Sequence, residues 1–421
     1  MKRTLFFYMF ACIAFASCEK EHGTSLTIED ETIDLSSDGT ANCYVLSAPG
    51  AYHFDATVIG NGASGIVSND FHTISAMIAP QSAKLIWQDY YEDGEGLITE
   101  VALNDDKTQI VFTTTEKNVS GNAVIAACDN NGNILWSWHI WKPLIAIEGI
   151  NSSTGYSVMN INLGAVTNEV ANPKSYGMLY QWGRNNPFPA SATLTGTTTT
   201  VSAPMYNMEG EPVTMQNSDW ANVSDNTILN AIQKPTTCFS RWGQLATSGD
   251  WLRADNSNDA LWGNPKGYET DENFTYINKG VKSIYDPCPA GWRVPPVDVF
   301  KNFINSMFTL SFDVTEFQVK DLNNDGVSDI NDYNYGWVFK LNDNDNSYFP
   351  SASRFDGQYG MLMGSMSGIW GTYWSNSSTG PTANPGTSVS PLSFGTSPIM
   401  VSVLANANRA DAYSIRCIKE N

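Results

Sequence analysis

The sequence predicts a mainly β protein with some α-helix (an α+β protein), in which an N-terminal β-sandwich is followed by a loop-rich module. Charged residues make up only 16% of the chain, whereas 33 glycines and 12% aromatic residues are present, a mix typical of short strands joined by polar turns. Short apolar runs are also bounded throughout by Gly, Pro, Asn and Asp. A chain of 421 residues is too long for one ordinary core, so we expect two domains.

The net charge of the chain is −20 at neutral pH. Nucleic acids and anionic membrane surfaces bind proteins through a basic stripe or patch, and the sequence contains none. Nucleic acid is therefore not an expected partner. The acidity is typical of a soluble, exported protein.

The N-terminus has the pattern of an export signal. Lys2 and Arg3 precede an apolar run over residues 5–15, and Ala16 and Ser17 lead directly to Cys18. The run is shorter than the roughly 20 residues that span a bilayer as a helix. An alternative is an ordinary secretory signal with an incidental cysteine.

Residues 1–18 resemble a bacterial lipoprotein signal that ends at its lipobox cysteine. The resemblance implies that Cys18 carries the lipid anchor and that residues 19–23 form a short tether. The acidic start of this tether resembles the export tags of Bacteroidota surface lipoproteins. We therefore expect a protein anchored by lipid in the outer membrane and facing the cell exterior.

Residues 24–143 are predicted to form the β-sandwich domain, with early strands over 41–46 and 52–54. The clearest hairpin joins strands over 123–127 and 134–141 through Asn131-Gly132, a pair that favours a type I′ turn. Both faces of the second strand carry large apolar side chains. Its tryptophans could stack on a sugar, but a covered core strand is the favoured interpretation. A linker over 144–154 follows.

Residues 155–421 carry four motifs in a fixed order. They are 176–184 (YGMLYQWGR) with 186–188 (NPF), 285–295 (YDPCPAGWRVP), 373–375 (YWS) and 413–417 (YSIRC). Together they resemble the Fibrobacter succinogenes major paralogous (FISUMP) domain, and residues 41–44 and 134–141 resemble the β domain that precedes such modules in Bacteroidota lipoproteins. The resemblance implies kinship with the C-type-lectin and formylglycine-generating-enzyme folds, in which few regular elements support long loops. That kinship implies a fold and not an activity.

The stretch 285–296 is the predicted anchor of the module. Pro287 and Pro289 hold Cys288 in extended backbone, and Gly291 turns the chain. A helix is expected over 297–307. Its apolar face would carry Phe300, Phe303, Ile304 and Met307.

Sequence features that would support the relatives' chemistry are missing. C-type lectins bind calcium and sugar through Glu-Pro-Asn and Trp-Asn-Asp motifs, which residues 211–213 and 374–376 do not match. All four histidines precede the module, so it offers no base for a serine or cysteine nucleophile. Formylglycine-type chemistry needs two active-site cysteines, but Cys288 and Cys417 belong to the motifs that begin and end the module. In an exported protein, a disulfide between those two is the alternative use that we expect.

One loop has the spacing of a calcium site. Oxygen-bearing side chains occupy positions one, three, five, nine and twelve of a 12-residue loop, with glycine at six and an apolar residue at seven: Asp321, Asn323, Asp325, Asp329, Asp332, Gly326 and Val327. This is the spacing of an EF-hand loop, in which the residue at seven lends its carbonyl. We expect a weak, structural Ca²⁺ site. An Asp/Asn-rich surface turn is the alternative.

These features predict a lipid-anchored, non-enzymatic surface protein that binds a glycan or a protein, as an adhesin or fimbria-associated component. The residues that would contact this ligand are not identifiable from the sequence. A structural subunit or cap of a surface filament is the second possibility. A formylglycine-generating-type enzyme ranks last, because only the fold kinship favours it.

Overall fold

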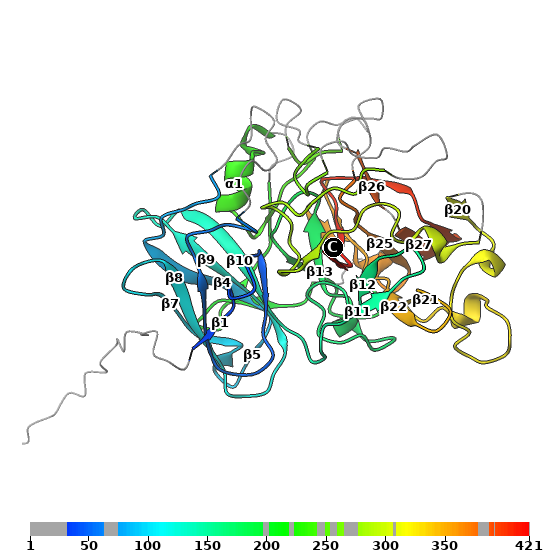
Figure 1. Ribbon diagram of the computed structural model, residues 1–421, viewed down its shortest axis with the longest axis horizontal. Coiled ribbons are helices and arrows are strands. Elements are labelled where there is room, and N and C mark those ends of the chain that lie inside the picture. The colour runs from blue at the N-terminus through cyan, green and yellow to red at the C-terminus, as the bar shows by residue number, and fades with distance from the viewer. Residues whose placement is uncertain are drawn as a thin grey trace, which may run out of the picture.

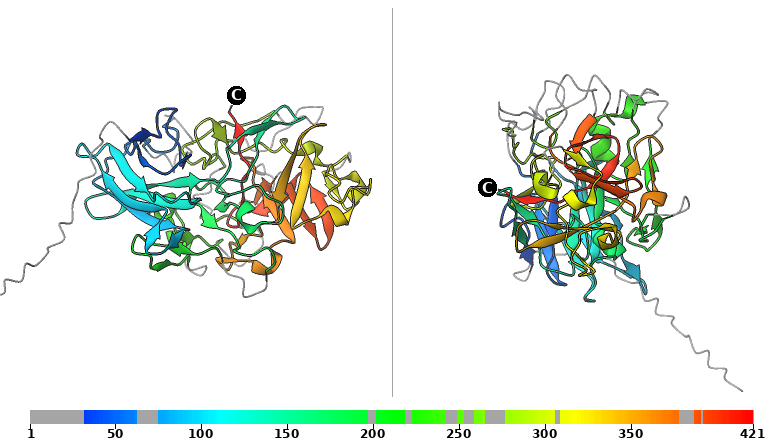
Figure 2. Two further views of the ribbon diagram at one scale, coloured as in Figure 1. Left: turned by 90° about the horizontal axis from the view of Figure 1, so that it is seen from below. Right: turned by 90° about the vertical axis from the view of Figure 1, so that its right-hand side faces the viewer.

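The structure is a computed structural model that describes residues 32–62, 75–196, 202–218, 223–241, 249–252, 259–264, 277–305, 309–377, 387–390 and 392–420. It is mainly β, with 36% strand and 7% helix, which confirms the predicted fold class. Figure 1 shows the strands of the N-terminal third, in blue and cyan, beside the larger remainder of the chain, and Figure 2 shows the same two parts lying end to end along the longest axis.

Two sheets form the N-terminal part. The four-stranded sheet has the order β1 (Ile33–Asp34), β3 (Ala51–Asp55), β8 (Gln109–Thr114), β7 (Ile98–Leu103). The six-stranded sheet has the order β16 (Pro212–Val213), β15 (Met205–Tyr206), β4 (Ser82–Gln88), β9 (Gly121–Cys128), β10 (Ile134–Lys142), β2 (Cys43–Val45). A small hairpin, β5 (Tyr91–Glu92) and β6 (Glu95–Gly96), follows β4.

Aromatic side chains lie between these two sheets. The ring of Phe54 on β3 lies 5.1 Å from that of Trp138 on β10 and 4.7 Å from that of Tyr44 on β2. Trp136, Trp138 and Trp141 are fully buried. The interpretation of β10 as a strand covered on both faces is therefore confirmed.

The predicted hairpin between β9 and β10 is present, but its turn differs from the prediction. Gly132 has a positive φ of 80°, whereas Asn131 does not, and a type I′ turn requires both. The backbone N–H of Gly132 donates to Asp129 O, and that of Asp129 donates to Asn133 O. Because Asp129 Oδ1 accepts from the N–H groups of Asn131 and Asn133, its side chain holds a longer turn in which only glycine needs left-handed backbone.

The remainder of the chain contains many short strands. A four-stranded sheet has the order β11 (Gly149–Asn151), β12 (Ser157–Met159), β31 (Ile418–Lys419), β19 (Trp292–Arg293). A nine-stranded sheet has the order β14 (Phe188–Pro189), β13 (Met178–Gln181), β30 (Ala412–Ser414), β25 (Trp370–Tyr373), β27 (Leu392–Thr396), β28 (Ile399–Ser402), β20 (Leu310–Ser311), with β23 (Phe355–Asp356) and β24 (Met361–Leu362) beside β30. Three two-stranded pairs complete it: β17 (Gln216–Asn217) with β18 (Thr237–Cys238), β21 (Gly336–Lys340) with β22 (Asn346–Pro350), and β26 (Thr387–Ser390) with β29 (Ala405–Asn408).

Helices are few in the described part of the chain. The α-helix α1 spans Ile228–Gln233, and Thr227 caps its N-terminus by accepting from the N–H of Asn230. Short 3₁₀ turns are η1 (Pro173–Ser175), η2 (Val223–Asp225), η4 (Lys301–Phe303), η5 (Val314–Glu316), η6 (Ile330–Asp332) and η7 (Gly364–Met366). No described helix is long and apolar enough to cross a membrane.

The prediction of a helix over 297–307 is wrong for residues 297–305. Met307 lies outside the described residues. Only η4 forms there, and Ile304 is extended and forms a bridge with Phe317. The apolar side chains are buried as expected, but the Phe303 ring stacks on Phe339 at 4.2 Å. These tertiary contacts outweigh the local helical periodicity.

The two parts of the chain share one hydrophobic core. It contains Trp136 and Trp138 from the first part and Trp182 and Tyr285 from the second. The strands β15 and β16 come from the second part yet extend the sheet of the first, since Tyr206 pairs with Gln88 on β4. Residues 149–151 of the predicted linker form β11, which pairs with β12.

Candidate functional site

A cavity of about 330 Å³ lies where the two parts of the chain meet. The first part contributes the segment that follows β4, including Asp89 and Tyr90, and the start of β9 with Asn122. The second part contributes Gly164, η1 with Lys174, and the start of β13 with Met178, so the lining combines charged and amide groups with methyl and thioether groups. Concave sites between domains with a few placed polar groups are a frequent location for small ligands.

Asp89 is the central acidic group of this cavity. Its Oδ1 accepts the backbone N–H of Asn122 and its Oδ2 accepts the Asn122 side-chain amide, both at 2.7 Å. Its own backbone N–H donates to Asn122 O. Each carboxylate oxygen therefore receives one hydrogen bond from the protein and keeps further acceptor capacity on a side chain that is partly open to the cavity.

The polar contact continues into the protein through a buried chain of side chains. Asn122 Oδ1 lies 2.8 Å from His139 Nε2, and His139 Nδ1 lies 3.2 Å from the hydroxyl of Tyr180. Because an amide oxygen can only accept, His139 Nε2 carries the proton, and the neutral ring accepts at Nδ1 from Tyr180. Every donor in the chain from Tyr180 to Asp89 thus points toward the cavity.

The orientation of Asn122 is fixed from two sides. Its Nδ2 donates to Asp89 and also to Gly164 O at 3.0 Å. Gly164 has a positive φ of 79°, and a Cβ at this position would lie 2.5 Å from Met178 Cγ. A glycine is therefore needed where the backbone comes close enough to accept from Asn122.

Burial shifts the pKa of both titratable groups in this chain. Desolvation raises the pKa of Asp89 to about 6, and the hydrogen bonds from Asn122 oppose the rise. Desolvation lowers the pKa of His139 to about 3, so the imidazole stays neutral between its two partners. The carboxyl group of Asp89 therefore changes its charge just below neutral pH.

The second cavity, of about 350 Å³, lies beside the predicted calcium loop. Lys320 and Leu322 line it together with Asn344, Asp345 and Asn346. The side chains of Lys320, Asn344 and Asp345 are exposed. The cavity at Asp89 has the stronger claim to a specific ligand, because its polar groups are fixed by buried partners.

The residues of the predicted calcium site lie in one loop that ends in η6. Asp321 accepts from the backbone N–H groups of Asn324 and Gly326, and Gly326 has a positive φ of 89°. Asp332 is buried and accepts from the N–H groups of Leu322, Asn323 and Asp329.

The side chains at the third, fifth and ninth positions of this loop bind neighbouring groups of the loop. Asn323 Oδ1 accepts from the N–H of Asp325, and Asp325 Oδ1 accepts from that of Val327. Asp329 accepts from the backbone N–H of Asn331. No group of three or more His, Cys, Asp or Glu side chains placed to hold a metal occurs among the described residues, so the calcium site stays a prediction.

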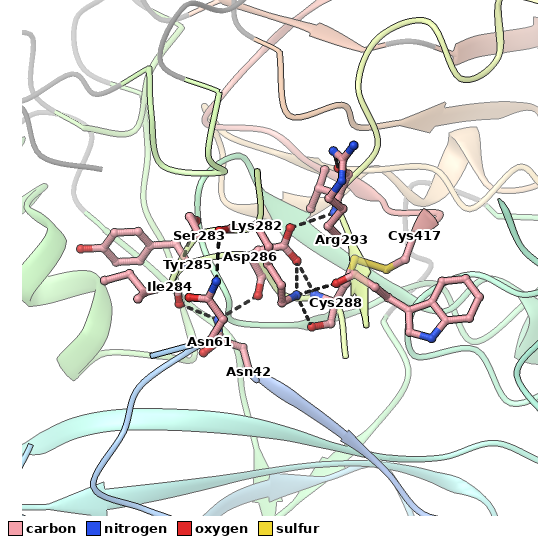
Figure 3. A network of polar contacts seen from close by, with 12 residues as sticks. Asn42, Asn61, Lys282, Ser283, Ile284, Tyr285, Asp286, Cys288, Arg293 and Cys417 are labelled. Atoms are coloured by element: carbon pink, nitrogen blue, oxygen red, sulfur yellow. Dashed lines mark hydrogen bonds and ion pairs between the residues drawn. A yellow bond between two sulfur atoms is a disulfide. The ribbon is translucent and has the colours of Figure 1, made fainter. Parts of the chain in front are cut away.

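The anchor stretch is built on a buried ion pair and a disulfide (Figure 3). Lys282 Nζ donates to Asp286 Oδ1 at 2.9 Å and to the carbonyls of Cys288 and Trp292. Asp286 also accepts from the N–H of Cys288. Cys288 is bonded to Cys417, as expected, and this ties the C-terminal strand β31 to β19.

The remaining predicted residues have different outcomes. Cys18 lies outside the described residues, so lipidation stays a prediction. Cys43, Cys128 and Cys238 are free and buried. Burial raises the pKa of the Cys238 thiol to about 12, so this side chain stays protonated and unreactive at neutral pH.

The cavity and its polar chain were not found from the sequence. The position of the histidines ahead of the module suggested that none could serve it, yet His139 contacts Tyr180 of that module. Asp89, Asn122, His139 and Tyr180 have no regular spacing. The only local signal was that His139 lies in a strand predicted to be covered on both faces.

Comparisons of the chain with protein-family models, with curated proteins and with solved structures find no match in any of the three. The resemblance to the FISUMP domain therefore stays a prediction from the four motifs.

Proposed function

We propose that the chain is a lipid-anchored, non-enzymatic protein of the outer cell surface that binds the end of a glycan in the cavity at Asp89. The observation that supports this most is the cavity itself, of about 330 Å³, in which a carboxylate is presented by Asn122 next to apolar groups such as Met178. Sugars offer hydroxyl groups to such acceptors and C–H faces to such apolar groups. A role of this kind suits an adhesin, either free-standing or fimbria-associated.

The proposed location comes from the sequence. The basic start, the apolar run and the small residues before Cys18 support a lipid anchor, and the acidic residues 19–21 support export to the outer face of the outer membrane. Fourteen residues, 19–32, separate Cys18 from the first described strand, β1.

The loop over 321–332 is proposed as a structural Ca²⁺ site. Asp321, Asn323, Asp325, Asp329 and Asp332 would supply side-chain oxygens and Val327 its carbonyl. Their hydrogen bonds within the loop leave lone pairs on most of these oxygens, and the left-handed backbone at Gly326 makes the sharp turn that such a loop needs. The residues present therefore fit a calcium ion, which would hold the loop together and take no part in chemistry.

The proposed binding function is tested on a glycan array with the full-length protein purified in detergent. Ala192 is an exposed residue of the cavity lining, so Ala192→Phe should fill the cavity without disturbing the core. Asp105→Asn, on an exposed turn of the first part, is the matched control. We expect the parent and Asp105→Asn to bind glycans that share a terminal unit and Ala192→Phe to lose them. A blank array for the parent, or binding that Ala192→Phe retains, contradicts a ligand site in this cavity.

A further inference from the structure

Asp89, which is partly buried, forms no ion pair in the described part of the chain, in contrast to two fully buried aspartates. Asp286 is paired with Lys282, and Asp250 with Arg409. No lysine, arginine or histidine of the described residues forms an ion pair with Asp89, and Lys174, an exposed residue of the cavity lining, attracts its carboxylate only weakly enough that burial still raises the pKa of Asp89. A desolvated carboxylate without a counter-ion is unfavourable, and a cation that enters the cavity would relieve this.

Among the described residues, none of the remaining charged and titratable groups around Asp89 forms an ion pair with it. Glu92, on the hairpin that follows Asp89, adds a second carboxylate to the lining, and Tyr90 is uncharged. Lys174 on η1 is the one positive group named in the lining, so the two carboxylates exceed it by one charge. His139 and Tyr180, which reach Asp89 only through Asn122, are neutral.

The polar chain behind Asp89 fixes which end of the Asn122 amide faces the carboxylate. If the Asn122 amide were reversed, its oxygen would face Asp89 Oδ2 and its NH₂ group would face His139 Nε2. An acceptor would then meet an acceptor at Asp89. Asn122, His139 and Tyr180 are therefore positioning residues, and they direct the free lone pairs of Asp89 to donors in the cavity.

We propose that the cavity takes a small ligand that carries a primary ammonium group, with Asp89 as the anion that binds it, and that the bound glycan end is an amino sugar with a free amine. This inference rests on the proposed glycan-binding function and deepens it. A volume of about 330 Å³ equals roughly eleven waters at about 30 Å³ each, which is enough for one sugar ring with its substituents. The ammonium group would donate to Asp89, and the C–H face of the ring would lie on Val166, Met178 and Ala190.

Glucosamine and glucose provide a matched pair of probes, since they differ only in an ammonium in place of a hydroxyl group. Both are titrated by calorimetry into the full-length protein in detergent at pH 7 and pH 5. We expect glucosamine to bind at least tenfold more tightly than glucose at pH 7. A carboxyl of pKa about 6 is roughly 90% ionised at pH 7 and roughly 10% at pH 5, so the glucosamine association constant should fall about ninefold.

Three variants separate the possible outcomes. Asp89→Asn should remove the preference for glucosamine, Ala192→Phe should remove binding of both sugars, and Asp105→Asn should behave as the parent. Melting curves check that each variant is folded. If Asp89→Asn does not fold, the comparison of the two sugars on the parent and on Ala192→Phe still tests the inference. Equal, pH-independent binding of both sugars that Ala192→Phe abolishes overturns the ammonium inference and leaves the glycan site standing. No binding of either sugar at millimolar concentration overturns the inference, while the array still decides the proposed function.

Discussion

Asn122 donates two hydrogen bonds to the carboxylate of Asp89, one from its backbone N–H and one from its side-chain amide, and each is 2.7 Å long. The oxygen of the same side-chain amide accepts a hydrogen bond from His139 Nε2. One buried asparagine thus connects an acid whose pKa is raised with a base whose pKa is lowered. As the pH falls, the two groups therefore change the stability of the protein in opposite directions.

The pH dependence of stability tests this pairing. His139 has a pKa of about 3 when folded and about 6.5 when unfolded, so the unfolded chain binds its proton first and stability is lost as the pH falls from about 6.5 to about 3. Asp89 has a pKa of about 6 when folded and about 3.9 when unfolded, so it adds stability as the pH falls through about 6 toward 4. Each effect amounts to about 1.4 kcal/mol per pH unit. The two offset one another between about pH 4 and 6.

Replacing either Asp89 or His139 should reveal the pH dependence of stability that the other residue causes. We expect the free energy of unfolding of Asp89→Asn, relative to the parent, to fall by about 1.4 kcal/mol per unit from pH 6 to 4. His139→Gln should be less stable than the parent at pH 7 and should gain on it as the pH falls. Urea unfolding at pH 4, 5, 6 and 7 measures both, with Asp105→Asn as control. Variants whose pH profiles run parallel to that of the parent would show that these two groups titrate normally.

The disulfide between Cys288 and Cys417 should contribute substantially to stability. It closes a loop over a sequence separation of 129 residues, and a cross-link of that span restricts the unfolded chain by roughly 3–5 kcal/mol. We expect the double variant Cys288→Ala/Cys417→Ala to melt well below the parent. A reducing agent should lower the melting temperature of the parent and of Cys128→Ala, whose thiol is free, but not that of the double variant. A parent that melts identically with and without reductant contradicts the bond.

The buried ion pair of the anchor stretch should tolerate no apolar replacement of its lysine. Lys282→Met removes three hydrogen bonds from Nζ and leaves the Asp286 carboxylate buried without a cation. The expected loss is about 3–5 kcal/mol of unfolding free energy in urea. Lys301→Met, at an exposed position on η4, should change it by less than about 0.5 kcal/mol. Similar small effects for both variants would mean that Lys282 does not neutralise Asp286.

Calcium should raise the melting temperature of the parent if the loop over 321–332 binds it. Calcium at about ten times Kd would add roughly 1.4 kcal/mol, and Asp321→Ala or Asp325→Ala should abolish that gain. Asp332→Ala should also lower stability in the presence of a chelator, because Asp332 accepts three backbone N–H groups of the loop. Asp343→Ala, in the neighbouring exposed turn, is the control. Identical calorimetric curves for the parent in millimolar calcium and in chelator rule the site out.

The proposed lipid anchor would be attached to the sulfur of Cys18. We expect Cys18→Ala to move the protein from the detergent phase to the aqueous phase in a phase-partition assay, since stable attachment needs more than one acyl chain. Cys128→Ala should partition as the parent does. A Cys18→Ala protein that stays in the detergent phase would remove the lipoprotein interpretation.

Local signals in the sequence predicted local structure well. The β9–β10 hairpin and the burial of Trp138 follow from strand pattern and turn residues that are close in the chain. The prediction of a helix over 297–307 was wrong because Phe303 stacks on Phe339 and Ile304 forms a bridge with Phe317. Local periodicity carries no information about contacts with residues this far along the chain. Cys288 and Cys417 were paired through their motifs. Without such motifs nothing in their spacing would have joined them.

The candidate site could not be predicted from the sequence, because its residues are also brought together by contacts between distant parts of the chain. Asp89 and Asn122 meet because β4 and β9 are neighbours, and Tyr180 reaches them because β13 lies against that sheet. Each of these residues is ordinary by itself. Their chemistry arises from desolvation at the junction of the two parts, which depends on packing that no short window of sequence contains.

The contacts of Asn42 make each part of the chain a poor substitute for any other neighbour of its partner. This residue is fully buried on the first part of the chain, donates to the carbonyls of Ile284 and Asp286 on the second, and accepts from the indole N–H of Trp136. A recombination event that joined either part to a foreign neighbour would remove the two hydrogen bonds from Asn42 to the carbonyls of Ile284 and Asp286, and each of these groups that stayed buried without a partner would cost about 1–3 kcal/mol. A chimaera that joins either part to a foreign neighbour should therefore be less stable than the parent protein.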